Sequence, residues 1–199
     1  MGRGAGGRGG AGAAAGAGPS LVGYSGREQR MIRNQLAGIP PEHLADINSV
    51  SSAAPEGSRD AGEWYVEREG NIIRSFNGQF NHDTGEMVVH PSALKERRGL
   101  NGPRTLIHEV GHNVTSTYRL QLPNDTHRRA IELRIHNESK YGFSATGLRP
   151  QSFSNPSEFI ADVYTVWARG TDRQWNNTNA LLTEALGENP RLVFGPRRR

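Results

Sequence analysis

The 199-residue chain is predicted to fold as a single α+β domain, in which a small mixed sheet precedes a mostly helical half. Two observations indicate this class. Short segments with strand patterns are confined to the first half, and longer helix-like segments dominate after residue 100. Strands followed by helices, with neither strict alternation nor an internal repeat, are typical of α+β domains. The length suits one domain with a core large enough to be stable.

The two ends of the chain differ in composition from the body, which we take as residues 20–190. Residues 1–19 are nearly all glycine and alanine, so we expect this segment to be disordered because it cannot bury enough apolar surface. Residues 191–199 form a basic C-terminal tail. Five of the 24 basic residues lie close to the two termini, namely Arg3, Arg8, Arg197, Arg198 and Arg199. The other 19 basic residues are balanced by 20 acidic residues, so the formal charge of +4 comes from the arginines near the termini.

This charge distribution and the composition argue against several classes of protein. A nucleic-acid-binding domain carries its positive charge as a patch on the fold, so no specific nucleic-acid partner is expected here. The chain has no cysteine, which excludes disulfides, thiolate metal sites and cysteine nucleophiles. Any metal must therefore be held by histidine and carboxylate side chains. The sequence has no apolar run of about 18 residues, so no transmembrane segment is expected.

In the first half, the sequence predicts one helix and a few short strands. Ser25 and Glu28 form the capping-box pattern of a helix that ends before Gly38. Alternating apolar residues and turn residues mark the strands. The expected strands are Ile47–Val50, Glu63–Glu69, Asn71–Phe76 and Met87–His90. The second and third of these favour a hairpin that turns at Gly70-Asn71.

The second half is predicted to be mainly helical. Helices are expected over residues 102–115, 125–139, 157–169 and 175–186. Pro103 suits a first helical position, and Asn155-Pro156 is a typical start for the third of these helices. Residues 141–153 have the composition of a loop. Within the tail, Leu192–Phe194 is apolar enough to dock on the body.

The sequence His108-Glu-Val-Gly-His112 lies within the first of these helices. Two histidines four residues apart share one helix face, so both imidazoles can reach one ion. Glu109, between them, can accept a proton from a metal-activated water without being a ligand. Gly111 weakens the helix by roughly 1 kcal/mol relative to alanine. A glycine at this position is explained if another backbone or the site itself comes close.

A second helix supplies a complementary carboxylate pair, Glu158 and Asp162, on an otherwise apolar segment. Two carboxylates are costly to bury without a cation. The cost is met if Glu158 completes the coordination of one zinc ion and Asp162 accepts the free ring N–H of a ligand histidine. Alternatively, both carboxylates lie on a solvated edge near the helix N-terminus, where the helix dipole favours negative charge.

These two motifs, His108-Glu-Val-Gly-His112 and Asn155-Pro-Ser-Glu158-Phe-Ile-Ala-Asp162, resemble those of the catalytic domain of anthrax toxin lethal factor and its relatives. Those proteins are zinc endopeptidases of the gluzincin type. The resemblance covers roughly residues 25–170 and is specific mainly in the two motifs. It implies a zincin-like fold, one Zn²⁺ held by His108, His112 and Glu158, Glu109 as general base, and Asp162 as the residue that orients a ligand histidine.

The same resemblance raises the question of a catalytic tyrosine. In that family, a tyrosine shortly upstream of the third ligand assists the tetrahedral intermediate, at about the position of Gln151 here. The nearest tyrosine is Tyr141. Either Tyr141 reaches the site, or Gln151 or another donor serves, or the enzyme is weak.

The sequence therefore predicts a zinc-dependent endopeptidase that acts on a protein or peptide substrate. In gluzincin-like folds the edge strand above the cleft pairs with extended substrate, and Met87–His90, comprising Met87, Val88, Val89 and His90, is the expected edge strand. The remaining histidines are expected at the surface or in loops, with His90 best placed to line the cleft. They are His43, His82, His90, His127 and His136. By analogy with the family, the chain is a toxin or effector, exported without a signal peptide or joined to a larger toxin or phage-borne polypeptide.

Two other classes of function stay open at this point. A degenerate metallopeptidase domain with a binding or structural role is favoured by the missing tyrosine, and it would not turn over peptides. A nucleic-acid-binding protein that uses its arginine-rich ends would lose affinity when those ends are deleted and when the salt concentration rises.

Overall fold

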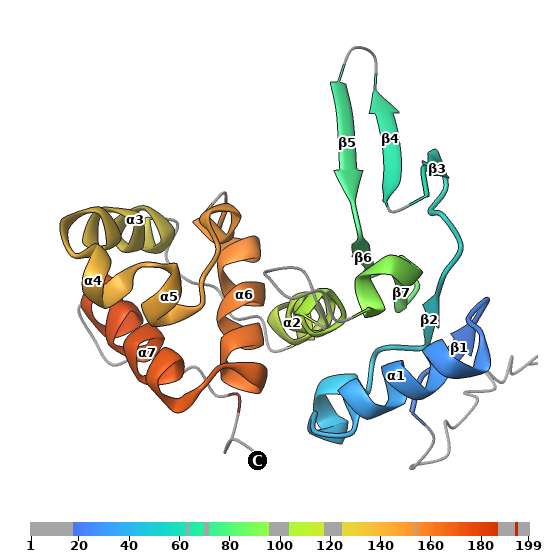
Figure 1. Cartoon of the computed structure of the whole chain (residues 1–199), viewed down its shortest axis with the longest axis horizontal. Helices are drawn as coiled ribbons and strands as arrows, with labels where there is room; N and C mark the ends of the chain where they lie inside the picture. Colours follow the sequence, from blue (N-terminus) through green and yellow to red (C-terminus); the bar gives the residue numbers. More distant parts are fainter. Residues whose placement is uncertain are drawn as a thin grey trace, which may run out of the picture.

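The computed structural model describes residues 18–62, 64–69, 72–95, 104–117, 125–153, 155–186 and 194. Two small sheets and a set of helices make an α+β fold, which confirms the predicted class. In Figure 1 the strands and the first helix lie on one side, the C-terminal helices lie on the other, and α2 (Arg104–Thr117) runs between them. The predictions for residues 1–17 and for most of the C-terminal tail lie outside the described residues.

The larger sheet has four strands in the order β1-β2-β7-β6. These are β1 (Ser20–Val22), β2 (Ser49–Ser51), β7 (Glu86–Val89) and β6 (Gly78–Asn81). The first three are parallel, whereas β6 runs antiparallel to β7 and forms one edge of the sheet. α2 packs against β6 and β7. The sheet is therefore mixed, and its antiparallel edge strand lies beside the helix that carries both candidate histidines.

The prediction that Met87–His90 is the edge strand is wrong. β7 lies inside the sheet, and its backbone pairs with β2 on one side and with β6 on the other. Met87, Val88 and Val89 are buried, and the His90 backbone N–H donates to the carbonyl of Asn77. These backbone groups are already paired within the protein, so they cannot pair with a substrate strand.

The second sheet has three strands in the order β3-β4-β5 and projects from the body in Figure 1. They are β3 (Ser58–Asp60), β4 (Tyr65–Glu69) and β5 (Ile72–Phe76). β4 and β5 pair antiparallel from Tyr65↔Phe76 to Glu69↔Ile72, which confirms the predicted hairpin. Its expected turn at Gly70-Asn71 lies outside the described residues.

The N-terminal helix, α1 (Gly26–Leu36), begins as the sequence predicts. The Ser25 side chain accepts from the Glu28 backbone N–H, and the Glu28 carboxylate accepts from the Ser25 N–H, so the capping box is complete. Ile32 and Leu36 are buried on its inner side. Two short 3₁₀ helices, η1 (Pro41–Leu44) and η2 (Pro91–Leu94), link the strands to the helices.

The C-terminal half contains five further helices among the described residues. They are α3 (Thr126–His136), α4 (Glu138–Tyr141), α5 (Phe143–Thr146), α6 (Pro156–Arg169) and α7 (Asp172–Leu186), with the 3₁₀ helix η3 (Pro150–Phe153) before α6. The expected loop at 141–153 is thus partly helical. Phe194 is buried against Tyr164 and Trp167, with ring centroids 5.1 and 5.5 Å away, so the expected docking is confirmed for Phe194. Leu192 and Val193 lie outside the described residues.

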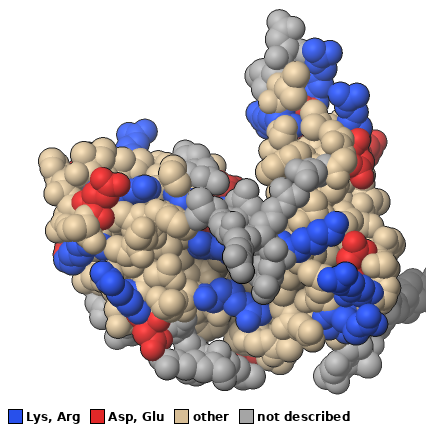
Figure 2. All heavy atoms as spheres, viewed as in Figure 1, with Lys and Arg blue, Asp and Glu red and all other residues tan. Residues whose placement is uncertain are grey.

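Charged side chains are spread over the face displayed in Figure 2. Lysine and arginine side chains occur on the helical side, on the strand side and on the projecting sheet, and acidic side chains are interspersed among them. They form no continuous basic stripe on this face of the described part of the chain. Among the described residues, no helix has both the length and the apolar character needed to cross a membrane.

α2 and α6 pack closely, and Gly111 explains how. A Cβ atom built on Gly111 would lie 2.8 Å from both the Cα and the carbonyl oxygen of Ala161 in α6. Real Cβ atoms do not approach a backbone this closely, so only glycine permits this helix spacing. The expectation that another backbone approaches Gly111 is confirmed.

Gly111→Ala is therefore expected to lower the free energy of unfolding by about 1–3 kcal/mol, the usual cost of overpacking, despite the better helix propensity of alanine. Urea denaturation measures this change. Gly26→Ala is the matched control because the nearest atom to its added Cβ is Arg30 Nη1 at 3.9 Å. A Gly111→Ala protein as stable as the Gly26→Ala protein would contradict the close packing of α2 on α6.

Candidate metal centre

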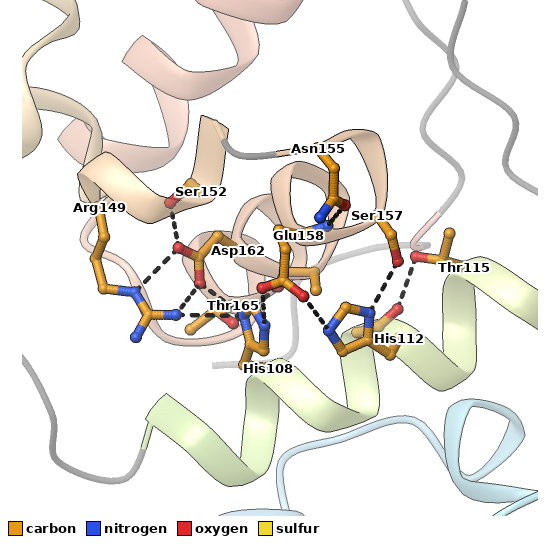
Figure 3. Close-up of polar contacts among 12 residues, drawn as sticks. His108, His112, Thr115, Arg149, Ser152, Asn155, Ser157, Glu158, Asp162 and Thr165 are labelled. Atoms are coloured by element: carbon orange, nitrogen blue, oxygen red, sulfur yellow. Dashed lines mark hydrogen bonds and ion pairs between the residues drawn. The ribbon is translucent and has the colours of Figure 1, made fainter. Parts of the chain in front are cut away.

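Three side chains from two helices converge at one point (Figure 3). His108 and His112 lie one turn apart on α2, and Glu158 faces them from the first turn of α6. His108 Nε2 lies 3.0 Å from Glu158 Oε2, and His112 Nε2 lies 3.3 Å from Glu158 Oε1. All three residues offer ligand atoms within 4.8 Å of one another, the sole such group of three or more among the described residues.

These distances fit a tetrahedral ion. Two atoms that each lie about 2.1 Å from a tetrahedral zinc are about 3.4 Å apart, close to the observed separations. Two imidazole nitrogens and one carboxylate also form a ligand set that zinc prefers in catalytic sites, where a fourth position stays open. The chemistry of the three residues therefore suits a zinc ion, and their ligand atoms, within 4.8 Å of one another, are close enough to share one.

The other ring nitrogen of each histidine also has a partner, which sets the direction of the ring. His108 Nδ1 lies 2.7 Å from Asp162 Oδ1, so the predicted contact between these two residues is confirmed. His112 Nδ1 lies 3.1 Å from the hydroxyl of Ser157. When Nδ1 carries the proton and donates it to these oxygens, both Nε2 lone pairs point to the common centre. Ser157 was not identified from the sequence.

The alternative of a solvated edge is wrong for Asp162. Its side chain is fully buried on α6, in contact with α2. Glu158 is partly exposed, near the helix N-terminus that Asn155 caps with a 3.0 Å bond to the Glu158 N–H. The helix dipole thus acts on Glu158, whereas Asp162 depends on specific partners.

Two of those partners were not predicted. Arg149, just before η3, contacts Asp162 with two nitrogens, and the Ser152 hydroxyl bonds to Asp162 Oδ2. A signal for Arg149 did exist in the sequence, because a buried carboxylate on an apolar helix requires a cation. The sequence could not name which arginine supplies it, since Arg149 lies in a segment with no regular pattern.

Glu109 is buried and is not part of the ligand group. Burial raises the pKa of its carboxyl group, although the nearby histidines His108 and His112 oppose this shift. The carboxylate lies beside Gly78 of the edge strand β6, since a Cβ atom built on Gly78 would lie only 2.8 Å from Glu109 Oε1. A glycine in β6 thus leaves room for the Glu109 side chain beside the candidate ligands.

The site strongly perturbs its own titrating groups. Burial lowers the pKa of His108, but hydrogen bonds to Asp162 and Glu158 outweigh this effect and raise the pKa to about 9. Hydrogen bonds from His108 and His112 hold the pKa of Glu158 far below its usual value. Burial raises the pKa of Asp162, yet its bonds to His108 and Arg149 lower it strongly overall. In the metal-free protein at neutral pH, His108 is therefore protonated between two carboxylates.

Tyr141 is not brought to the site. It ends α4, which packs against α3, α5 and α7, and its side chain is buried in the core. The Lys140 ammonium lies over its ring at 4.6 Å and bonds to Glu184 of α7 at 2.7 Å. The prediction that Tyr141 reaches the metal centre therefore has no support in the structure. Gln151 lies in η3, and its side chain is outside the described residues.

Two of the other histidines are buried rather than at the surface. His43 is buried, 2.9 Å from the Tyr164 hydroxyl, and His90 is buried with its ring 4.9 Å from the ring of Tyr65. His90 joins the end of β7 to β3 through Asp60, at 3.4 Å, so it holds the two sheets together. His82 and His136 are exposed, as expected.

Comparisons of the chain with protein-family models, with curated proteins and with solved structures found no match. The likeness to lethal factor thus consists of the two sequence motifs. The geometry of the described residues carries the functional conclusion that follows.

Proposed function

We propose that the protein is a zinc-dependent endopeptidase with a zincin-like fold. The observation that carries this proposal is the convergence of His108, His112 and Glu158, next to a buried Glu109 that lies outside the ligand group. A purely structural metal site is closed by four protein ligands, whereas three ligands with a nearby carboxylate suit hydrolysis. The two motifs that resemble lethal factor support the same class.

Each residue has a definite task in this proposal. Bound zinc would polarise the substrate carbonyl and make a water molecule more acidic. Glu109 takes the proton of the attacking water and delivers it to the leaving amine, a role that suits a carboxyl group whose pKa burial has raised. Asp162 and Ser157 keep the rings of His108 and His112 in the ligating orientation.

The edge strand β6 replaces Met87–His90 as the proposed substrate strand. β6 lies at the end of the sheet order and, among the described strands, pairs with β7 on one side only. Its Gly78 lies beside the Glu109 carboxylate. An extended peptide that pairs with its outer edge would pass beside the general base. Substrate recognition through main-chain hydrogen bonds would follow from this arrangement.

A second candidate function is a degenerate metallopeptidase domain that binds metal or peptide without turnover. One observation favours it, namely that Tyr141 lies in the helical core and so cannot act as the family tyrosine. The resemblance to lethal factor also suggests a toxin or effector role, within a larger or exported polypeptide.

Zinc titration tests the metal centre directly. The wild-type protein is expected to bind one zinc ion per chain, with an affinity that rises about tenfold per pH unit below pH 9, because zinc must displace the proton of His108. Competition with a chromophoric chelator between pH 6.5 and 8.5 measures this slope.

The stability of the metal-free protein should change in the opposite sense over the same range. The folded pKa of His108 is raised above its ordinary 6.5, so its stabilising contribution is fully present below pH 6.5 and is lost as the pH approaches 9. Absence of zinc uptake at every pH would refute the proposed function. A zinc affinity that does not depend on pH would refute the inference that His108 is protonated in the metal-free protein.

A further inference from the structure

The carboxylate of Asp162 is held at both oxygens, although it is fully buried. Oδ1 accepts from His108 Nδ1 at 2.7 Å and from Arg149 Nη2 at 2.7 Å. Oδ2 accepts from Arg149 Nε at 3.0 Å and from the Ser152 hydroxyl. Figure 3 shows Arg149 and His108 on neighbouring sides of this carboxylate. One arginine therefore engages both oxygens of the group that orients a metal ligand.

We propose that Arg149 is a positioning residue of the metal centre, which acts by fixing Asp162 and, through it, the ring of His108. This inference rests on the proposed zinc site. The planar guanidinium makes two parallel bonds to the carboxylate, so it sets the carboxylate plane as well as its place. Oδ1 then stays aimed at His108 Nδ1, and His108 Nε2 stays aimed at the common centre with His112 and Glu158.

The position of Arg149 is itself anchored to the helix that carries the histidines. Arg104, at the start of α2, donates from Nη2 to the carbonyl of Gly147 at 2.7 Å. Gly147 ends α5 with a φ of +77°, and Leu148 after it is fully buried. The segment before Arg149 is thus fastened to α2, while the Arg149 side chain bonds to α6. The arginine couples the two helices at the place where the ligands meet.

The charge of the cluster supports the same role. Glu158 and Asp162 place two carboxylate groups against His108. The Arg149 guanidinium pairs with the Asp162 carboxylate. A buried carboxylate that loses its partner is strongly destabilised. Lysine cannot reproduce the two parallel bonds of the guanidinium because its ammonium group is a single point charge.

The test compares three variants with the wild-type protein, using zinc affinity as the readout. Arg149→Met removes the guanidinium that bonds to both oxygens of Asp162. Arg149→Lys keeps the positive charge without the planar geometry, and Arg169→Met is the matched control. Arg169 lies at the other end of α6, where its guanidinium bonds to the carbonyl of Gln35. Zinc dissociation constants come from chelator competition, and the visible spectrum of the cobalt-substituted protein reports the geometry of the ligands. Thermal unfolding of each metal-free protein gives its stability.

Arg149→Met is expected to weaken zinc binding roughly 10- to 100-fold, the range that is typical when the partner of a ligand histidine is lost. Its cobalt spectrum should shift as well. Arg149→Lys should fold, recover part of the affinity, and still differ from the wild type in its cobalt spectrum. Arg169→Met should keep both the wild-type affinity and the wild-type spectrum, even if its melting temperature falls.

Wild-type zinc affinity and cobalt spectra in both Arg149 variants would overturn the inference while leaving the proposed zinc site intact. An equal loss of affinity in Arg169→Met would also overturn it, because general destabilisation would then explain the effect. If the Arg149→Met protein fails to fold, the Arg149→Lys protein provides the test. Wild-type zinc affinity and a wild-type cobalt spectrum in that variant would then overturn the inference. No zinc binding by the wild-type protein would instead remove the proposed function, and this inference with it.

Discussion

Glu109→Gln is expected to lower the rate of peptide hydrolysis by at least about 10²- to 10⁴-fold, the usual contribution of a general base. The glutamine keeps the size of the side chain but cannot accept the proton of the attacking water. Zinc affinity should stay close to that of the wild type, since Glu109 lies outside the ligand group. Hydrolysis of a peptide mixture, followed by mass spectrometry, and a zinc titration on the same sample measure the two effects.

The control for this substitution is Glu184→Gln. Glu184 lies on α7, where its exposed carboxylate bonds to Lys140. Removal of this charge should leave hydrolysis unchanged. A Glu109→Gln protein that loses its zinc would show that Glu109 is a ligand. One that keeps full activity would show that another group is the base.

Asp162→Asn is expected to weaken zinc binding or peptide hydrolysis roughly 10- to 100-fold. The amide keeps the volume of the carboxylate but accepts more weakly from His108 Nδ1 and loses the ion pair with Arg149. Glu158→Gln should have at least as large an effect, since it alters a proposed ligand. The helix should persist in both variants because its buried apolar residues are unchanged, and circular dichroism checks this. Unchanged zinc affinity and activity in the Asp162→Asn protein would show that Asp162 does not contribute to zinc binding or hydrolysis.

Much of the site was predictable because its signals are local in the sequence. The spacing of His108 and His112 places both on one helix face. Glu158 and Asp162 are also four residues apart, on a second, largely apolar helix. The capping box at Ser25 and the hairpin formed by β4 and β5 are local patterns as well, and all of these features are present in the structure.

The errors arise where long-range pairing decides the outcome. β1, β3 and β6 have three or four residues each, too few for a recognisable alternation. The expectation that Met87–His90 is the edge strand rests on analogy with gluzincin-like folds, whereas the sheet order that places β7 inside depends on strands far apart in the chain. The composition of residues 141–153 predicts a loop that begins at Tyr141, whereas Tyr141 ends the short helix α4, which packs against α5 and α7. Arg149 lies in irregular chain, so no periodicity could link it to Asp162.

The most direct test of a zinc peptidase is the hydrolysis of a mixed peptide library by the wild-type protein before and after removal of its metal. The zinc-loaded protein is expected to turn over peptides, to lose this activity after dialysis against a chelator, and to recover it with one equivalent of zinc per chain. Turnover that persists without metal, or zinc-loaded protein that cleaves no peptide in the library, would contradict this expectation.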